Sequence, residues 1–278
     1  MSGSGLTTTA NALFIANADG TVTPTELARG PWSAASLHGG PVAMLAARAV
    51  EALPGDGIEW FVSRLTIELE RPVPVEPLRV IAEVTRAGRK VSVVEVTVRL
   101  AADDRVLSRA RAQRIRSADV SLPDDDPVLG PLLALEVPPP GPDGGRAERT
   151  AMDDYVGFHN YATEHRLTRG AWNEPGPVVD WVRLRYPAIA GEALSPLQRV
   201  AAAVDFPNGI ARVLSFDTHL FINPDLTIHQ FRAAVGSWIA IDSRMHHGSC
   251  GVGMTDTAIY DTIGRVGRSN QSVLLDTA

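Results

Sequence analysis

The chain has 278 residues, of which 45% are hydrophobic and 21% are charged, and its formal net charge is −6. This length allows one large domain or two domains of about 100–150 residues each. The acidic balance argues against a nucleic-acid-binding surface, because phosphate binding requires an excess of lysine and arginine.

The cysteine content and the N-terminus narrow the class of protein further. The single cysteine, Cys250, excludes an intramolecular disulfide and a cysteine-rich zinc site, and it indicates a reducing compartment. The N-terminus lacks a basic start followed by an apolar run, so we expect no secretory signal. No apolar run approaches the about 18 residues that a membrane span requires. We therefore expect a cytoplasmic protein without a membrane partner.

The first half predicts one helix followed by four strands. A short strand is expected at 12–15. Apolar residues then recur with helical spacing from Val42 to Leu53, and His38-Gly39-Gly40-Pro41 marks the start of this helix. Four extended runs alternate apolar and polar residues, as half-buried antiparallel strands do: Phe61–Leu69, Leu78–Arg86, Val91–Leu100 and Val106–Arg116.

Residues 117–148 change in composition. They are rich in proline, aspartate and glycine and have no sustained periodicity, which is typical of a linker. We therefore predict an N-terminal domain over 1–118, a linker over 119–148 and a C-terminal domain over 149–278.

The second half repeats the order of elements of the first. Extended runs at 158–167 and 178–186 precede a helix that Ser195 caps and Pro196 opens, and Pro207-Asn208-Gly209 ends this helix. Four further strands are expected at Arg212–Ile222, Ala233–Ser243, Val252–Asp261 and Ser269–Asp276. Each half thus combines a small-residue helix with about five antiparallel strands, and a strongly twisted sheet can wrap such a helix. The pattern predicts an α+β fold.

Groups capable of chemistry gather in the stretch 215–254. It contains Asp217 on a predicted strand, the pair His246-His247, Cys250 and a cluster of glycines. Adjacent histidines on a strand point to opposite faces, and no third ligand follows at a typical spacing, so we predict no metal. No phosphate-binding glycine motif is recognisable, and we predict no cofactor. Asp205, at the end of the second helix, is interpreted as a capping or structural acid close to the same cleft.

Five short motifs suggest a family. They are W-x5-HGG at Trp32–Gly40, R-x-G-R-K at Arg86–Lys90, the helix end at Asp205–Gly209, S-F-D at Ser215–Asp217, and the run Tyr260–Gln271. Their order and spacing resemble the double-hotdog acyl-CoA thioesterases, in particular the actinobacterial thioesterase-like branch of the bacterial type II family. The resemblance covers roughly Pro31 to Leu275. It implies a tandem hotdog fold, in which each half wraps an antiparallel sheet around a central helix.

The resemblance also implies site residues. In the family, an aspartate, a glutamine and a hydroxyl residue of the second domain hold the attacking water. The aspartate matches Asp217 and the glutamine matches Gln271, whereas the hydroxyl falls between Met245 and His247, where this sequence has none. His247 or Ser249 is the expected substitute.

The start of the first helix is the expected oxyanion site. Backbone N–H groups at a helix N-terminus attract negative charge, and glycine permits a close approach to the ligand. We therefore expect His38, Gly39 and Gly40 to bind the substrate and its developing oxyanion.

The leading hypothesis is an acyl-thioester hydrolase acting on a coenzyme A or carrier-protein thioester. Two alternatives stay open. One is a lyase, cyclase or isomerase acting on an acyl or polyketide-like substrate, and the other is a non-catalytic acyl-binding protein. Because hotdog sheets often associate, a homo-oligomer is expected by analogy.

Overall fold

The computed structural model describes residues 7–148 and 155–277 of the chain. The strands of the first half are β1 (Phe14–Ala16), β2 (Val22–Pro24), β3 (Trp60–Glu68), β4 (Leu78–Arg86), β5 (Val91–Leu100) and β6 (Val106–Arg116). Those of the second half are β7 (Arg146–Glu148), β8 (Thr163–Arg169), β9 (Val178–Leu184), β10 (His219–Ile222), β11 (Asp225–Gln230), β12 (Trp238–His247), β13 (Val252–Tyr260) and β14 (Arg265–Thr277).

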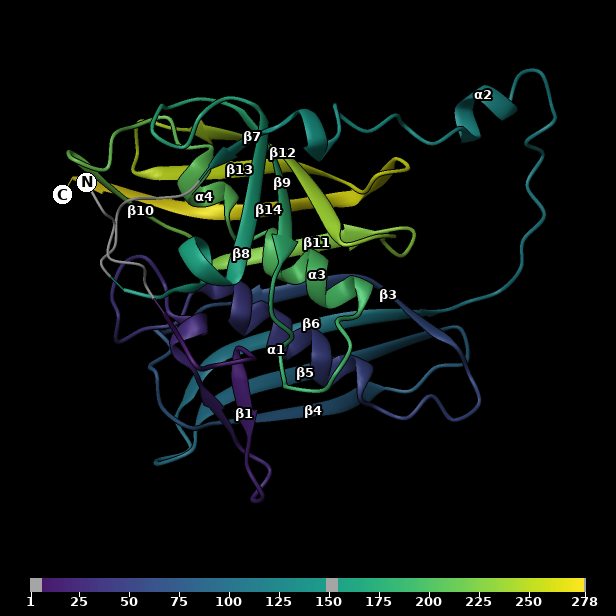
Figure 1. Cartoon of the computed structure of the whole chain (residues 1–278). Coiled ribbons are helices and arrows are strands. Elements are labelled where there is room, and N and C mark those ends of the chain that lie inside the picture. The colour runs from purple at the N-terminus through teal and green to yellow at the C-terminus, as the bar shows by residue number, and fades with distance from the viewer. Residues whose placement is uncertain (1–6, 149–154, 278) are drawn as a thin grey trace.

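Within the described ranges these 14 strands form one sheet (Figure 1). Its order is β1-β2-β4-β5-β6-β3-β11-β14-β13-β12-β9-β8-β7, and β10 pairs with β14 beside this path. The two halves of the chain meet where β3 pairs antiparallel with β11. At this seam Leu65 lies opposite Ile228 and Ile67 lies opposite Leu226, and all four side chains are buried. The seam therefore continues the hydrophobic core from one half into the other.

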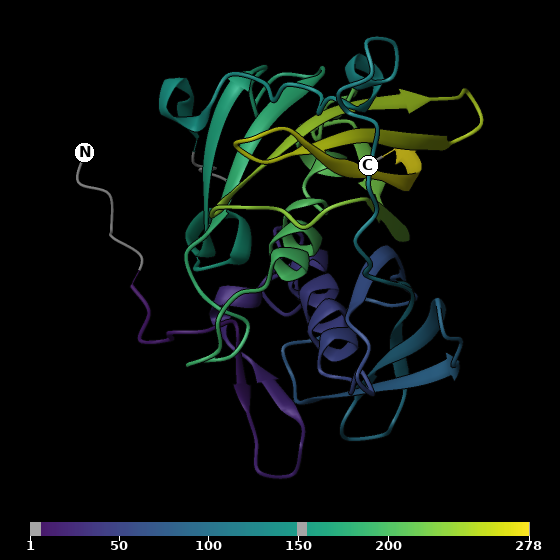
Figure 2. The same cartoon turned by 90° about the vertical axis from the view of Figure 1, so that its right-hand side faces the viewer.

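The helical segments are few and mostly short. They are η1 (Glu26–Ala28), α1 (Gly39–Glu51), α2 (Gly130–Leu133), η2 (Pro142–Gly144), η3 (Phe158–Ala162), α3 (Pro196–Ala203) and α4 (Pro207–Ile210). Figure 2 shows α1 and α3 together in the middle of the molecule, between the strands of the two halves. No helix in the described part of the chain is long and apolar enough to cross a membrane.

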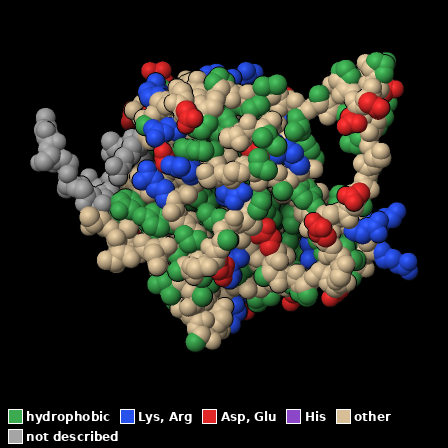
Figure 3. Space-filling view, turned by 45° about the vertical axis from the view of Figure 1, so that its right-hand side comes forward, with side chains coloured by type: hydrophobic (Ala, Val, Ile, Leu, Met, Phe, Trp, Pro, Cys, Tyr) green, Lys and Arg blue, Asp and Glu red, His purple; other side chains and the backbone are tan. Residues whose placement is uncertain are grey.

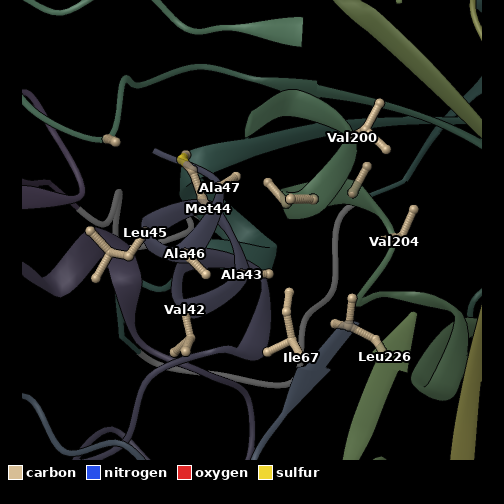
Figure 4. Close-up of a cluster of buried hydrophobic side chains, with 14 of the residues drawn as sticks. Val42, Ala43, Met44, Leu45, Ala46, Ala47, Ile67, Val200, Val204 and Leu226 are labelled. Carbon is tan, nitrogen blue, oxygen red and sulfur yellow. The ribbon is translucent and has the colours of Figure 1, made fainter. Parts of the chain in front are cut away.

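Helix α1 forms where the sequence predicted it. Its side chains from Val42 to Ala47 are all buried, and it contacts β3 to β6 as well as α3. Figure 4 shows these side chains packed with Ile67, Val200, Val204 and Leu226. Each fully buried valine, leucine or methionine stabilises the fold by about 1.5–3 kcal/mol. The many alanines let the two helices and the sheet approach closely.

Helices α1 and α3 run antiparallel. The hydroxyl of Ser195 caps α3 by accepting from the amide of Gln198 at 3.0 Å, as the sequence predicted. The same hydroxyl donates to Glu51 at the end of α1, at 2.8 Å, and the side-chain amide of Gln198 donates to that carboxylate at 3.1 Å. Burial raises the pKa of Glu51. The start of α3 thus lies against the end of α1, and the end of α3 lies against the start of α1.

The predicted strand Arg212–Ile222 is wrong over most of its length. Only β10, from His219, is extended, because Arg212 and Ser215 stabilise turns. The guanidinium of Arg212 donates to the carbonyl oxygens of Trp172 at 2.5 Å and Gly209 at 3.3 Å, and the Ser215 hydroxyl accepts from the amide of Asp217 at 3.2 Å.

The predicted extended run 158–167 is wrong over its first half. Residues Phe158–Ala162 form the helical turn η3, in which the Asn160 side chain accepts from the amide of Gly157 at 2.9 Å. Strands β2, β7 and β11 were not predicted. Strands β4, β5 and β6 have the predicted bounds, and the other predicted helices and strands are present with shifted ends.

The linker stands away from the body of the molecule around α2, and hydrophobic side chains cover its tip (Figure 3). Further along, the chain is anchored again. The indole of Trp181 donates to the carbonyl of Pro140 at 2.8 Å, and Arg265 forms an ion pair with Glu136 at 2.9 Å. The domain boundaries inferred from this linker stay a prediction.

Candidate active site

A buried carboxylate lies at the N-terminus of α1. It belongs to Asp205, just beyond the end of α3, and only 7% of this residue is exposed. One carboxylate oxygen lies 2.7 Å from His38 Nδ1, and the other accepts from Asn223 Nδ2 at 2.8 Å. Burial acts to raise the pKa of Asp205, but His38, Asn223 and the amide of Gly40 outweigh it, so this pKa is lowered. Asp205 is therefore ionised at neutral pH.

The two glycines that open α1 permit this approach. A Cβ on Gly39 would lie 2.6 Å from Asp205 Oδ1 and 2.7 Å from Oδ2. A Cβ on Gly40 would lie 2.7 Å from the carbonyl oxygen of Ala202 in α3. All three distances are shorter than a carbon atom tolerates. The glycine pair is thus required by the contact between the halves of the chain.

The carboxylate decides the tautomer of His38. Nδ1 lies 2.7 Å from Asp205 Oδ2 and 3.1 Å from the amide nitrogen of Gly40. One nitrogen cannot donate to the first and accept from the second at once. The shorter contact, to a charged acceptor, favours a proton on Nδ1. The Gly40 amide then interacts with the carboxylate, and Nε2 keeps its lone pair.

Aromatic rings surround His38. Its centroid lies 5.1 Å from that of Phe158 and 4.8 Å from that of Phe206. In the described part of the chain, no side chain or backbone group hydrogen bonds to His38 Nε2. This arrangement can transfer a proton, because an oriented imidazole has one free basic nitrogen.

Gln271 belongs to the same buried cluster. It lies on β14, is 1% exposed, and accepts from the Thr255 hydroxyl at 3.0 Å through Oε1. Its Nε2 approaches the backbone carbonyl of Asp205 at 3.4 Å. An aspartate, a glutamine and a threonine hydroxyl therefore converge here.

The other predicted site residues lie elsewhere. Asp217 is exposed in the turn before β10, not on a strand, and its carboxylate accepts from Ser215 at 3.1 Å. His247 ends β12, and Ser249 and Cys250 lie in the following loop, all three exposed. No hydrogen bond among the described residues joins Asp217, His247 or Ser249 to Gln271. The structure does bring His38, Gly39, Gly40 and Gln271 together.

Sequence reasoning placed Asp205 close to the cleft but interpreted it as a capping or structural acid, and it missed Asn223 and Thr255. One signal for Asp205 was available: an acid directly after an apolar helix, between Val204 and Phe206, has to be buried with them. Its partner could not be identified from the sequence, because His38 comes from the other half of the chain.

A second buried polar network lies close by. His165 Nδ1 is 2.7 Å from Asp180 Oδ2, its Nε2 is 2.8 Å from the Thr163 hydroxyl, and that hydroxyl donates to the carbonyl of Phe158 at 2.8 Å. His159 stacks over His38 at 6.4 Å between centroids. Burial, together with repulsion from His38 and His165, lowers the pKa of His159 to about 3. His159 and His165 line a cavity of about 210 Å³.

Among the described residues, no three histidine, cysteine, aspartate or glutamate side chains lie close enough together to hold a metal ion.

Comparisons with solved structures define the class of fold. A protein of Novosphingobium aromaticivorans whose structure is described as that of a thioesterase superposes with a TM-score of 0.71 at 20% sequence identity. The match covers 96% of this chain and 100% of that chain. A hot dog fold protein of unknown function from Alicyclobacillus acidocaldarius has a TM-score of 0.70 at 15% sequence identity, and the match covers 93% of this chain and 94% of that chain. An acyl-CoA thioesterase II from Mycobacterium marinum has a TM-score of 0.63 at 16% sequence identity, and the match covers 87% of this chain and 90% of that chain. The chain has a hotdog fold, with a large antiparallel sheet and few helices.

Family models identify the family. The acyl-CoA thioesterase N-terminal domain matches residues 28–115, and the acyl-CoA thioesterase C-terminal domain matches residues 135–275. The chain therefore belongs to the acyl-CoA thioesterase family, which is a class of thioester hydrolases. No curated protein matches its sequence.

Proposed function

We propose that this chain hydrolyses acyl-CoA thioesters at the cluster of His38, Asp205 and Gln271. The observation that carries the proposal is the buried His38–Asp205 pair, 2.7 Å apart, at the junction of the two halves of the chain. Asp205 takes the role that the sequence predicted for Asp217, because Asp205 is the acid that lies with Gln271.

In this mechanism His38 is the general base. Asp205 accepts a hydrogen bond from Nδ1–H and stays ionised. Nε2 therefore removes a proton from a water that the Gln271 amide orients. The water oxygen attacks the thioester carbonyl carbon to form a C–O bond. The tetrahedral intermediate then breaks its C–S bond, and the protonated His38 returns a proton to the thiolate. Asp205 acts through His38 and is a positioning residue.

The oxyanion needs a hydrogen-bond donor at the same place. The Gly40 amide is engaged with the His38–Asp205 pair, whereas the Gly39 amide also lies in the first turn of α1. Donors at a helix N-terminus stabilise developing negative charge. We therefore assign the oxyanion to the Gly39 amide.

The finer architecture is part of the proposal. We infer two tandem hotdog domains, each with a central helix, at 1–118 and 149–278 with the linker 119–148. The separate matches of an N-terminal and a C-terminal family domain support this division. A carrier-protein substrate, a cytoplasmic location and a homo-oligomer stay predictions.

The test is thiol release from acyl-CoAs of short, medium and long chain length. Asp205→Asn keeps the volume of the side chain and removes its charge, and it should lower kcat/KM by about 10²–10⁴-fold. It should also shift the acid limb of the pH profile, which reports the base that Asp205 orients. Asp217→Asn is the matched control, and its kcat/KM should stay within about threefold of wild type because its carboxylate is exposed.

The outcomes separate the hypotheses. No thiol release from any acyl-CoA would refute hydrolysis. Mass spectrometry would then distinguish a product formed without addition of water from simple acyl binding. A large loss in Asp217→Asn with none in Asp205→Asn would return the role to Asp217.

A further inference from the structure

A row of polar side chains crosses the seam between the two halves of the chain. In the strand register, Gln113 on β6 lies opposite Arg64 on β3, Arg64 lies opposite His229 on β11, and His229 lies opposite Arg268 on β14. Their sequence neighbours Leu65 and Ile228 are buried in the core. Successive side chains of a strand point to opposite faces, so this row lies on the face of the sheet that is turned away from α1 and α3.

A cavity opens along this row. Its volume of about 530 Å³ is within the range of small-molecule sites. Three arginines line it, Arg64, Arg265 and Arg268, against the single acid Glu136. The cavity is therefore positively charged on a protein whose net charge is −6.

One cationic side chain in this cavity lacks an ion-pair partner among the described residues. Arg265 pairs with Glu136 at 2.9 Å and Arg268 pairs with Asp256 at 2.5 Å. Arg64 has no ion pair among the described residues, and its Nε is buried without a hydrogen bond.

The unpartnered Arg64 side chain indicates an anionic ligand. A buried donor or acceptor without a partner costs about 1–3 kcal/mol, and more if it is charged. In the strand register Arg64 and Arg268 flank His229, so both guanidinium groups lie on this face of the sheet. An anion bound by Arg64 would relieve the cost of its unpartnered Nε.

An exposed aromatic ring lies at the same cavity. Phe231 follows Gln230, lines the cavity and is 61% exposed. A ring next to cationic side chains is typical of surfaces on which a nucleobase stacks while arginine binds its phosphate.

We propose that this cavity is a binding site for a phosphorylated nucleoside. Arg64 binds the phosphate, and Phe231 stacks on the base. The site lies across the sheet from His38 and Asp205, so its ligand is separate from the acyl group undergoing hydrolysis. The proposal does not depend on the proposed hydrolysis.

Two sources share this chemistry, namely free adenine nucleotides and the adenosine 3′,5′-bisphosphate end of coenzyme A. Isothermal titration calorimetry of the full chain with ADP, with adenosine 3′,5′-bisphosphate and with inorganic phosphate separates them. We expect saturable binding of a nucleotide, tighter than that of phosphate and weakened by added salt. The tighter of the two nucleotides identifies the source.

Variants test the residues. Arg64→Gln should raise the nucleotide Kd about tenfold or more, through loss of a charged hydrogen bond. Phe231→Ala, at an exposed position where misfolding is not a concern, should raise it about fivefold or more. Arg89→Gln, in an exposed turn elsewhere, should leave the Kd unchanged. Absence of nucleotide binding, equal affinity for phosphate alone, or an unchanged Kd in Arg64→Gln and Phe231→Ala would overturn the proposal.

Discussion

His159 should make the stability of this protein strongly dependent on pH between 7 and 5. The residue is 6% exposed, and its pKa is lowered from 6.5 to about 3, first by burial and then by repulsion from His38 and His165. Between these two pKa values the unfolded chain binds a proton that the folded chain does not. The free energy of unfolding therefore rises with pH across this window. The contribution of the neutral His159 side chain is lost as the pH falls from 6.5 toward 3.

The magnitude follows from the same two values. Each pH unit inside the window is worth about 1.36 kcal/mol, so the full effect approaches about 5 kcal/mol at pH 3. Between pH 7 and pH 5 the loss is about 2 kcal/mol. The lowered pKa of Asp205 acts only at lower pH, below the ordinary range of an aspartate, and so does not contribute between pH 7 and 5.

Urea denaturation at pH 7 and pH 5 measures this difference. Wild type and His247→Gln, which changes an exposed histidine, should each lose about 2 kcal/mol on acidification. His159→Gln should lose less than about 0.5 kcal/mol over the same interval, whatever its stability at pH 7. An equal loss in all three proteins would show that His159 is not the group that titrates.

Two further predictions concern the close contacts. Gly39→Ala places a methyl carbon 2.6 Å from Asp205 Oδ1 and must displace the carboxylate. The value of kcat/KM should therefore fall about 10²-fold or more, and the free energy of unfolding should fall by about 1–3 kcal/mol. Wild-type turnover would refute the close approach. Arg232→Gln leaves the fully buried Asp261 without its ion pair and should cost about 3–5 kcal/mol of unfolding free energy, whereas Arg268→Gln, which breaks an exposed ion pair, should cost about 0–1 kcal/mol. Similar costs in urea denaturation would contradict this distinction.

The regular strands of the first half could be predicted from the sequence almost to the residue. Strands β4, β5 and β6 begin and end where the predicted runs do. Their alternation of apolar and polar residues is a local property that each segment carries with it. The start of α1 at the two glycines, and the cap of α3 at Ser195, are local in the same sense.

The segments that differ owe their structure to contacts with distant residues. Strand β11 is short, and it forms because β3 and β14 pair with its two edges. The predicted strand that contained Asp217 is mostly turn, because Arg212 hydrogen bonds to the carbonyl of Trp172. Asp225–Gln230 does alternate polar and apolar residues, but only over six residues. The contact of Arg212 leaves no pattern in the chain.

The candidate site divides in the same way. The sequence by itself determined the family resemblance, the HGG helix start and Gln271, because these depend on residue types at short spacings. Only the tertiary structure decided that Asp205, rather than Asp217, joins them. The reason is physical: a carboxylate can be buried as an ion only where partners surround it, and the partners of Asp205 come from the start of α1 and from the segment between β10 and β11. Antiparallel packing of α1 and α3 brings these segments together.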